Sequence, residues 1–233
     1  MRPLEKRPWP TDDQGAPKTY SPYGKAKDDL IDNLGPYCSF CEREGYYSAL
    51  DVEHIQPKGL TQYAHLEENW DNFLLGCKNC NPIKGDKDVV LTDIFLPHQN
   101  NTVLIFEYLQ GGLIQLSSHL TSTERKKAKR LMDLVGLDRR PGRPNYSTRD
   151  KRWQDRMNVY NLAERYLGKY ENGTASEDVV VDLARASGFW SVWMCVFDQH
   201  AEVKNRLIAE FPGTCMHCFD VNAQPLRRNG NEI

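Results

Sequence analysis

The sequence contains no long hydrophobic run, since no stretch approaches the roughly 20 apolar residues of a membrane-spanning helix. Residues 1–10 are polar and include three prolines, which argues against a secretory signal peptide. The chain also has no internal repeat and no low-complexity tract. With 233 residues, 39% of them hydrophobic, it is long enough to build a core. We therefore expect a folded cytoplasmic protein with no membrane partner.

The sequence also lacks an excess of charge, because 30 lysines and arginines face 32 aspartates and glutamates. This balance excludes a uniformly basic coat for nucleic acid. Positive charge is local instead: residues 124–152 hold eleven lysines and arginines against four acids. Such a run is either a solvated helix face or a track for a phosphate backbone. The predicted nucleic-acid contacts are Lys84, Lys87, Arg125, Lys126 and Arg130.

Cysteines are few, and four of the seven form two C-x2-C pairs. These four are Cys38, Cys41, Cys77 and Cys80. In a reducing compartment, this spacing is typical of a four-thiolate zinc site rather than of disulfides. We predict a structural Zn²⁺ that closes the loop between the pairs and makes a small module foldable. Cys215 and Cys218 repeat the spacing without a second pair, so we expect them to be reduced and metal-free.

Polar residues suited to phosphodiester hydrolysis lie between and beside the two cysteine pairs. Such hydrolysis needs a base for water and a cation for the leaving oxygen. His54 can act as the base through its neutral imidazole. Oxygen atoms of Glu53 and Asn81 can hold a catalytic Mg²⁺ or Mn²⁺. Asn72 can hydrogen-bond the backbone of the loop that orients His54.

Each of these residues also has a simpler interpretation. A strand-end histidine such as His54 is often only a satisfied hydrogen-bonding group. Asn81, just before Pro82, can be a helix N-cap, and Asn72 can be a turn residue. Asp51 is either a further acid beside Glu53 or a solvated side chain. The Glu53–His54 pair between the two cysteine pairs favours the catalytic interpretation.

Hydrophobic alternation predicts a strand over 50–55, a return strand over 73–75 and a short helix near 78–84. An extended proline-rich arm over 1–24 and a short helix over 23–34 precede them. A small β meander is predicted from three further runs, 89–96, 102–108 and 113–116.

The second half of the chain is predicted to be helical. A capping box at Thr121–Glu124 opens a helix that ends at Gly136. Ser147 and Thr148 open a longer helix, whose recurring apolar residues we expect in the core. These are Trp153, Met157, Tyr160, Leu167 and Tyr170. A third helix covers 176–187, and the apolar run 189–197 opens a helix toward Phe211. That run either fills the protein's own core or faces a partner.

The quoted cysteine pairs, Glu53-His54-Ile55-x-Pro57, residues 69–74 and Cys80-Asn81-x-x-Lys84-Gly85 resemble the zinc-stapled HNH endonuclease (ββα-metal) motif. The resemblance covers residues 38–87. It implies that His54 is the general base, that Glu53 and Asn81 are metal ligands, and that Asn72 is the structural asparagine. Many members have histidine where this chain has Asn81.

More widely, the proline-rich start, the helical half with Leu134-Val-Gly-Leu-Asp-Arg139 and the Trp/Arg-rich helix after it resemble the PtuB family. These proteins are HNH effector subunits of Septu and retron-associated anti-phage systems. The resemblance implies an SMC/ABC-like ATPase partner (PtuA-like), a nucleic-acid substrate (DNA or tRNA) and a possible complex with retron msDNA and reverse transcriptase. The apolar run 189–197 and the proline arm are the candidate docking elements.

We therefore expect an α+β fold in three parts: an arm and short helix (1–34), an HNH zinc module with a β extension (35–120) and a helical, partner-docking region (121–233). Two rival functions stay open. One is a non-catalytic zinc ribbon that binds nucleic acid or protein, for which His54 is dispensable. The other is a stand-alone restriction-type HNH nuclease, which would need a base-reading domain of its own.

Overall fold

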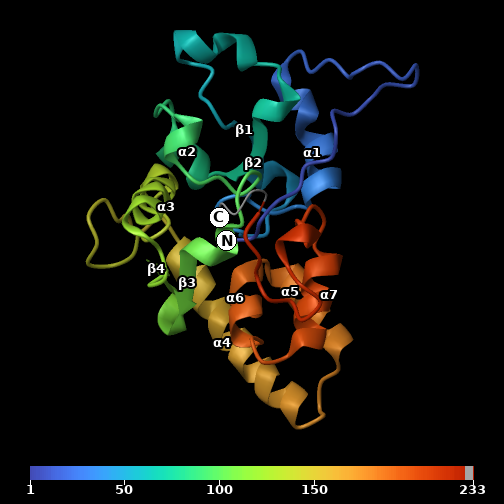
Figure 1. The fold of residues 1–233 in the computed structure, drawn as a ribbon, viewed down its shortest axis with the longest axis vertical. Coiled ribbons are helices and arrows are strands. Elements are labelled where there is room, and N and C mark those ends of the chain that lie inside the picture. The colour runs from blue at the N-terminus through green and yellow to red at the C-terminus, as the bar shows by residue number, and fades with distance from the viewer. Residues whose placement is uncertain (229–232) are drawn as a thin grey trace.

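The computed structural model describes residues 1–228 and 233, and it shows the expected α+β fold class. The β1–β2 hairpin with α1 and α2 lies at one end of the long axis in Figure 1, and α4 to α7 form the other end. The elements in chain order are α1 (Lys27–Leu34), β1 (Leu50–His54), β2 (Phe73–Cys77), α2 (Cys80–Lys84), β3 (Phe106–Leu109), β4 (Leu113–Leu116), α3 (Ser122–Val135), α4 (Arg152–Glu171), α5 (Glu177–Ser187), α6 (Trp190–Val196) and α7 (Ala201–Glu210). None of the described helices is long and apolar enough to cross a membrane.

The β1–β2 hairpin carries the residues that the sequence singles out. The two strands pair antiparallel, with Leu50 opposite Cys77 and His54 opposite Phe73. Both faces are covered, because α1 and α2 pack against β2 and the 3₁₀ turn at 23–26 packs against β1. The expected half-exposed strand is therefore wrong in one respect: Glu53 and His54 are both buried, at 5% and 7% exposure. Polar groups buried this deeply need specific partners.

The β extension is a two-stranded hairpin rather than a meander. Strand β3 pairs with β4 antiparallel, from Phe106 opposite Leu116 to Leu109 opposite Leu113. The predicted strand over 89–96 is wrong, since this segment is irregular apart from a 3₁₀ turn at Leu91–Asp93. Three consecutive residues, 94–96, are buried there, so the side chains do not alternate between a core face and a solvent face.

Helix α3 follows the sequence prediction closely. The Thr121 side chain accepts a hydrogen bond from the Glu124 amide, and the Glu124 carboxylate accepts one from the Thr121 amide, which completes the capping box. The helix ends at Gly136 in the left-handed conformation, with φ of 61°. Its buried residues, among them Leu131 and Val135, form one stripe against the core.

Helix α4 begins later than predicted. Ser147 and Thr148 lie in an irregular connection, and the helix starts at Arg152. The predicted core stripe is also displaced around the helix, because Trp153, Met157, Tyr160, Leu167 and Tyr170 are only half-buried. The fully buried positions are Arg152, Arg156, Val159 and Ala163. Because two of these four buried residues are arginines, a pattern of apolar residues alone cannot identify the buried face of α4.

The apolar run 189–197 belongs to the core, so the alternative that it docks a partner is wrong. Trp190 and Trp193 are each at most 1% exposed, and Phe197 is fully buried. The single helix expected toward Phe211 is also wrong, since the chain breaks after Val196 into α6 and α7.

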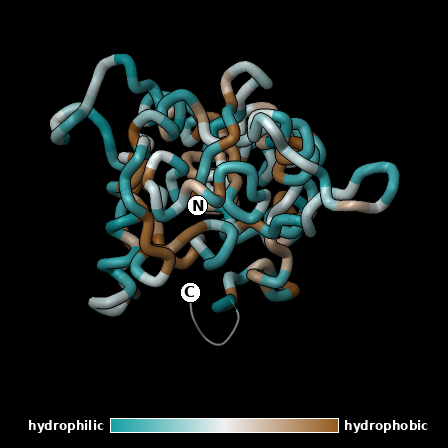
Figure 2. The backbone as a smooth tube through the Cα atoms, turned by 90° about the horizontal axis from the view of Figure 1, so that it is seen from above, coloured by the Kyte–Doolittle hydropathy of each residue, from teal (hydrophilic) through white to brown (hydrophobic). Residues whose placement is uncertain are grey.

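The N-terminal arm is docked at its start. Met1 to Leu4 are buried, and the Arg2 guanidinium donates to the carbonyl of Leu34 and to the carbonyl of Pro212. The arm thus joins the C-terminal end of helix α1 to the segment after α7. Figure 2 shows the N-terminus among packed segments, while the projecting loops are mainly hydrophilic or neutral.

One buried carboxylate ties the first cysteine pair to the helical region. Glu42 directly follows Cys41, and its Oε1 accepts from Ser191 Oγ at 2.6 Å while its Oε2 accepts from the Ser191 amide at 2.9 Å. The Phe189 amide also donates to the Glu42 carbonyl at 2.8 Å. The first turn of α6 is therefore fixed directly against the cysteine cluster.

Candidate metal centre and active site

The four cysteines of the two pairs meet in one buried cluster. Their Sγ atoms lie within 4.8 Å of one another, and the Cys41 and Cys77 sulfurs are 3.6 Å apart. Four thiolates bound tetrahedrally at about 2.3 Å from a zinc ion would be separated by about 3.8 Å. Burial, together with the neighbouring sulfurs, raises the pKa of the Cys80 thiol well above its usual range. The spacing of the four sulfurs fits a tetrahedrally bound divalent ion, and the cluster suggests a structural zinc site.

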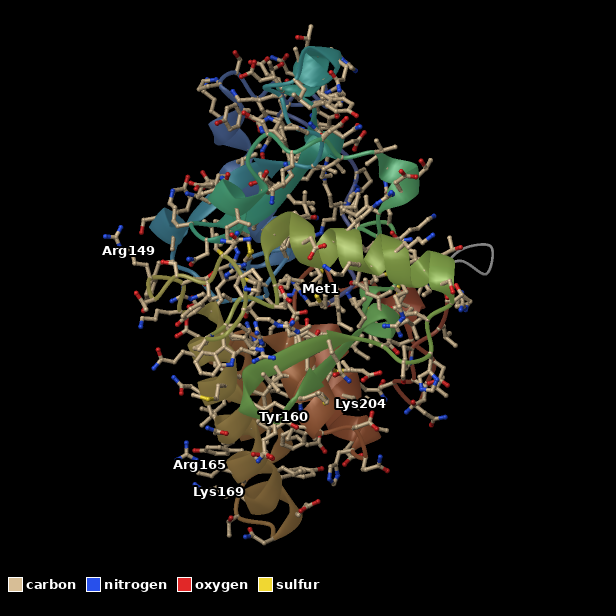
Figure 3. The ribbon with its side chains drawn as sticks, turned by 90° about the vertical axis from the view of Figure 1, so that its left-hand side faces the viewer. Met1, Arg149, Tyr160, Arg165, Lys169 and Lys204 are labelled. Carbon is tan, nitrogen blue, oxygen red and sulfur yellow. The ribbon has the colours of Figure 1, made fainter. Side chains whose placement is uncertain are left out.

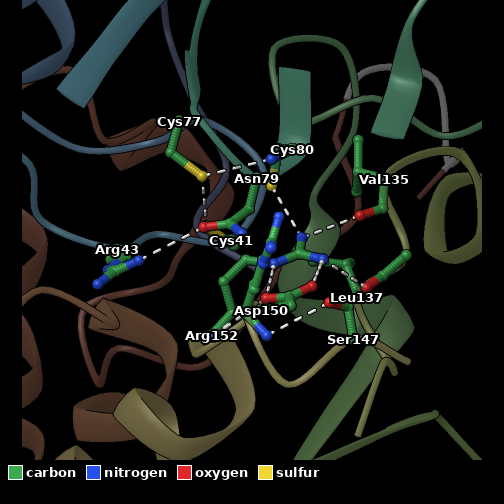
Figure 4. A network of polar contacts seen from close by, with 12 residues as sticks. Cys41, Arg43, Cys77, Asn79, Cys80, Val135, Leu137, Ser147, Asp150 and Arg152 are labelled. Atoms are coloured by element: carbon green, nitrogen blue, oxygen red, sulfur yellow. Dashed lines mark hydrogen bonds and ion pairs between the residues drawn. The ribbon is translucent and has the colours of Figure 1, made fainter. Parts of the chain in front are cut away.

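Arg152 supports this cluster from α4, as Figure 4 shows. Its Nη1 donates to Cys80 Sγ at 3.1 Å and to the Val135 carbonyl at 2.9 Å. Its Nη2 donates to the Gly136 carbonyl and forms a 2.6 Å ion pair with Asp150. Burial alone would lower the pKa of Arg152, but Cys80 and Asp150 outweigh it and raise that pKa. Arg152 thus joins the sulfur cluster to the end of α3; the sequence showed it only as one cation in a basic run.

Glu53 and Asn81 both pack over Gly76, on the side of its backbone where a Cβ would project. Glu53 Oε2 and Asn81 Cβ lie 3.2 and 3.3 Å from the position that a Cβ on Gly76 would occupy. Oε2 is fully buried and has no hydrogen-bond partner within the described part of the chain. An orphaned carboxylate oxygen beside an amide side chain is an arrangement that a hard divalent cation fits. The residues present are therefore compatible with the Mg²⁺ or Mn²⁺ expected from the sequence.

The alternative that Asn81 is a helix N-cap is wrong. Helix α2 begins at Cys80 and its N-cap is Asn79. Asn81 lies inside the first turn, where its side chain has no capping role. Asp51, two residues before Glu53, forms a partly exposed ion pair with Lys78 at 2.6 Å. Its carboxylate is thus satisfied by a surface lysine.

Lys84 holds the other oxygen of Glu53. Its Nζ lies 3.0 Å from Glu53 Oε1, and the two side chains are 1% and 6% exposed. Burial raises the pKa of Glu53, while the Lys84 ammonium opposes that rise. This burial contradicts a role for Lys84 as a surface contact for nucleic acid. The ion pair instead fixes the carboxylate so that Oε2 points away from the lysine.

His54 has a defined tautomer. Its Nε2 lies 2.9 Å from the Glu67 carbonyl oxygen, which can only accept, so Nε2 carries the proton and Nδ1 carries the lone pair. Nδ1 has no protein partner among residues 1–228 and 233, and it is not one of the fully buried polar atoms that lack a partner. Burial lowers the pKa of His54, and the nearby Lys58 and Lys84 lower it further. The ring is therefore neutral at pH 7 and presents a basic nitrogen.

Asn72 fastens the loop that follows His54. Its Oδ1 accepts from the Gln56 amide at 2.8 Å, and its Nδ2 donates to the Gln56 carbonyl at 2.9 Å. The Asn72 carbonyl also accepts from the Ile55 amide at 2.8 Å. These bonds hold the end of β1 against the start of β2. Asn72 is accordingly a positioning residue rather than a group that touches substrate.

Two side chains near His54 were not recognised from the sequence. The Tyr23 ring packs edge-on against His54, with a centroid distance of 4.7 Å. Lys58 Nζ lies 4.3 Å from the Tyr23 ring centre and pairs with Glu67. Lys58 directly follows Pro57 of the motif, so its position in the sequence could have indicated that it lies near His54. Tyr23 lies outside the motif, and no pattern pointed to it.

The remaining predicted nucleic-acid contacts are on the surface, in different settings. Lys87 Nζ donates to the Leu134 carbonyl at 3.1 Å. Arg125 donates to the Ser117 carbonyl at 2.8 Å, and Lys126 is exposed. Arg130 is paired with Asp93 at 2.8 Å. Their binding of nucleic acid stays a prediction.

Cys215 and Cys218 are buried free thiols outside the four-sulfur cluster. The hydrogen bond from Cys218 lowers the pKa of Cys215 to about 7. No other cysteine, histidine or acid in the described residues joins them in a metal-binding group.

A β hairpin is followed by a short helix, is joined to a four-cysteine cluster and carries an acid–histidine pair on its first strand, and this combination suggests a metal-dependent nuclease. The HNH endonuclease family model matches residues 37–87, and these residues form the HNH domain of the chain. The match covers well under half of the sequence. No curated protein matches the sequence.

Proposed function

We propose that this protein is a metal-dependent HNH endonuclease that hydrolyses phosphodiester bonds of nucleic acid. The observation that carries the proposal is the buried, unpartnered Oε2 of Glu53 beside Asn81, on the same hairpin as a histidine held in its Nε2–H tautomer. The HNH match over residues 37–87 supports it. A zinc ribbon that binds nucleic acid or protein without catalysis does not account for a buried carboxylate oxygen that lacks a hydrogen-bond partner.

In this mechanism, His54 Nδ1 accepts a proton from a water molecule as the water oxygen attacks phosphorus. The P–O3′ bond breaks and the leaving 3′ oxygen takes a proton from solvent water, which leaves a 3′-hydroxyl and a 5′-phosphate. Glu53 and Asn81 would hold the divalent cation, which supplies charge stabilisation to the scissile phosphate and the leaving oxygen. The Glu67 carbonyl and Tyr23 orient the imidazole, and Asn72 holds its loop. The four-cysteine zinc site stays structural.

Replacing the proposed metal ligands should change the metal requirement of cleavage. We expect Glu53→Gln and Asn81→Ala to raise the Mg²⁺ concentration that gives half-maximal cleavage by at least about tenfold. Because Glu53→Gln leaves the Lys84 ammonium buried without a counter-charge, the double variant Glu53→Gln/Lys84→Met is measured beside it. The readout is cleavage of labelled DNA and RNA across a Mg²⁺ and a Mn²⁺ titration.

Asp51→Asn is the matched control, since it removes a carboxylate from the same strand whose partner is the exposed Lys78. It should leave the metal requirement unchanged. An equal shift in the Asp51→Asn variant, or none in the Glu53 and Asn81 variants, would exclude the proposed ligand set.

We further propose that the enzyme is a cytoplasmic effector of an anti-phage defence system and works with a PtuA-like SMC/ABC ATPase, with DNA or tRNA as substrate. This rests on the PtuB resemblance of the sequence. A free nuclease would damage its host, so partner control predicts that the isolated subunit cleaves nucleic acid more slowly than the complex purified from the native host. The comparison is made with and without ATP. Equal rates for subunit and complex would contradict partner control.

A further inference from the structure

A groove of about 750 Å³ lies between α3, β4 and the irregular segment that follows α3. Five cationic side chains line it: Lys87, Arg125, Lys129, Arg139 and Arg143. Only two acids, Asp133 and Asp138, lie among them. The groove therefore carries a net positive charge in a protein whose total charge is −2.

The groove follows one face of α3. Arg125, Lys129 and Asp133 are spaced four residues apart, so they lie one above another along the helix. Arg130 points to another side of the same helix, where it is paired with Asp93 at 2.8 Å. Figure 3 shows α3 lying across this face, between the HNH domain and the β3–β4 hairpin.

Three of the five cations have no carboxylate partner. Lys129 is paired with Asp133 at 2.5 Å and Arg143 with Asp138 at 3.8 Å. Lys87 and Arg125 donate only to backbone carbonyls. Within residues 1–228 and 233, Arg139 forms no ion pair, and it lies over Gly136, where a Cβ would come within 2.6 Å of its Nε. Three cations without a close ion-pair partner, in a groove with more cations than acids, favour an anionic ligand with several charges in a row.

The groove includes Lys87, in the segment that directly follows α2. Lys87 lies three residues after Lys84, whose Nζ contacts Glu53, and α2 packs against α3. We propose that this groove holds the sugar–phosphate backbone of the nucleic-acid strand that runs through the active site. The inference rests on the proposed nuclease function and adds a binding surface outside the HNH domain. In this proposal, Arg125, Arg139 and Lys87 each contact a backbone phosphate.

The test is a binding measurement that does not depend on cleavage. In the His54→Ala background, the Arg125→Ser/Arg139→Ser pair should weaken binding of labelled oligonucleotides by about tenfold or more at 0.1 M salt. The slope of log affinity against log salt should fall by about two, one for each lost phosphate contact. Duplex DNA, single-stranded DNA and RNA are tested in parallel, because all three present the same backbone. Unfolding midpoints confirm that the variants are folded.

The matched control is Arg165→Ser/Lys169→Ser, two exposed cations at the far end of α4 (Figure 3). It should leave both affinity and slope unchanged. In the protein that retains His54, the Arg125→Ser/Arg139→Ser substitutions should raise the KM for nucleic acid and leave kcat near its normal value. Glu53→Gln, by contrast, should lower the cleavage rate at any substrate concentration. Unchanged binding by the groove variant would overturn the inference while leaving the nuclease proposal standing. Loss of a co-purifying protein subunit, with nucleic-acid binding intact, would also overturn it.

Discussion

Replacing His54 with alanine should lower the rate of phosphodiester cleavage by at least about 100-fold, because general bases typically contribute 10² to 10⁴-fold. The ring is held by the Glu67 carbonyl and the Tyr23 edge, so its Nδ1 is the nitrogen available to water. No other described histidine lies on strand β1 or β2. The measurement is single-turnover cleavage of a labelled substrate at saturating Mg²⁺.

His65→Ala is the control for this variant, since His65 is an exposed histidine in the loop between β1 and β2. It should cleave at the wild-type rate. Binding of the oligonucleotide should be unchanged in both variants. If His54→Ala cleaves as fast as His65→Ala, the non-catalytic scaffold would be the better description of the protein.

Disrupting the sulfur cluster should have the largest effect on stability. Structural zinc contributes about 10–16 kcal/mol of apparent binding free energy in small zinc domains. We expect Cys80→Ser to lower the free energy of unfolding by at least about 5 kcal/mol, which lowers Tm by about 10–20 °C for a chain of this size. The Arg152 guanidinium would also lose its thiolate partner while buried. Thermal unfolding and zinc content per chain measure the two effects.

Cys195→Ser is the matched substitution, because Cys195 is an exposed thiol outside the cluster. It should retain one zinc per chain and the wild-type Tm. Chelation of zinc from the wild-type protein should reproduce the Tm of Cys80→Ser. A Cys80→Ser protein with an unchanged Tm would show that the four sulfurs do not stabilise the fold through a metal.

The sequence predicted those parts of the fold that depend on local chemistry. The capping box at Thr121 and the left-handed Gly136 fixed α3 at both ends, and the hairpin with α2 followed from alternation and turn signals. Predictions failed where long-range packing decides. The face of α4 that packs against its neighbours includes Arg152 and Arg156, which are buried only because distant carbonyls, an acid and a thiolate accept their hydrogen bonds.

For the site, the motif brought Glu53, His54, Asn72 and Asn81 into consideration, and the structure places them on one hairpin and its helix. The motif did not predict which other side chains surround these residues or which of them are buried. Tyr23 reaches His54 from a separate segment, and the burial of Lys84 against Glu53 depends on α2 packing over the sheet. Motif spacing records which residues recur together, but it does not show which of them are exposed.

In the proposed mechanism, Glu53, Asn81 and His54 together hydrolyse phosphodiester bonds with the help of a divalent cation. The most direct measurement is the end chemistry of nucleic acid cleaved by the zinc-loaded protein, isolated with any co-purifying subunits, with and without added Mg²⁺ or Mn²⁺. Hydrolysis by activated water predicts 3′-hydroxyl and 5′-phosphate ends that form only when the cation is added. Products with 2′,3′-cyclic phosphate ends, or no cleavage with either cation, would contradict the account.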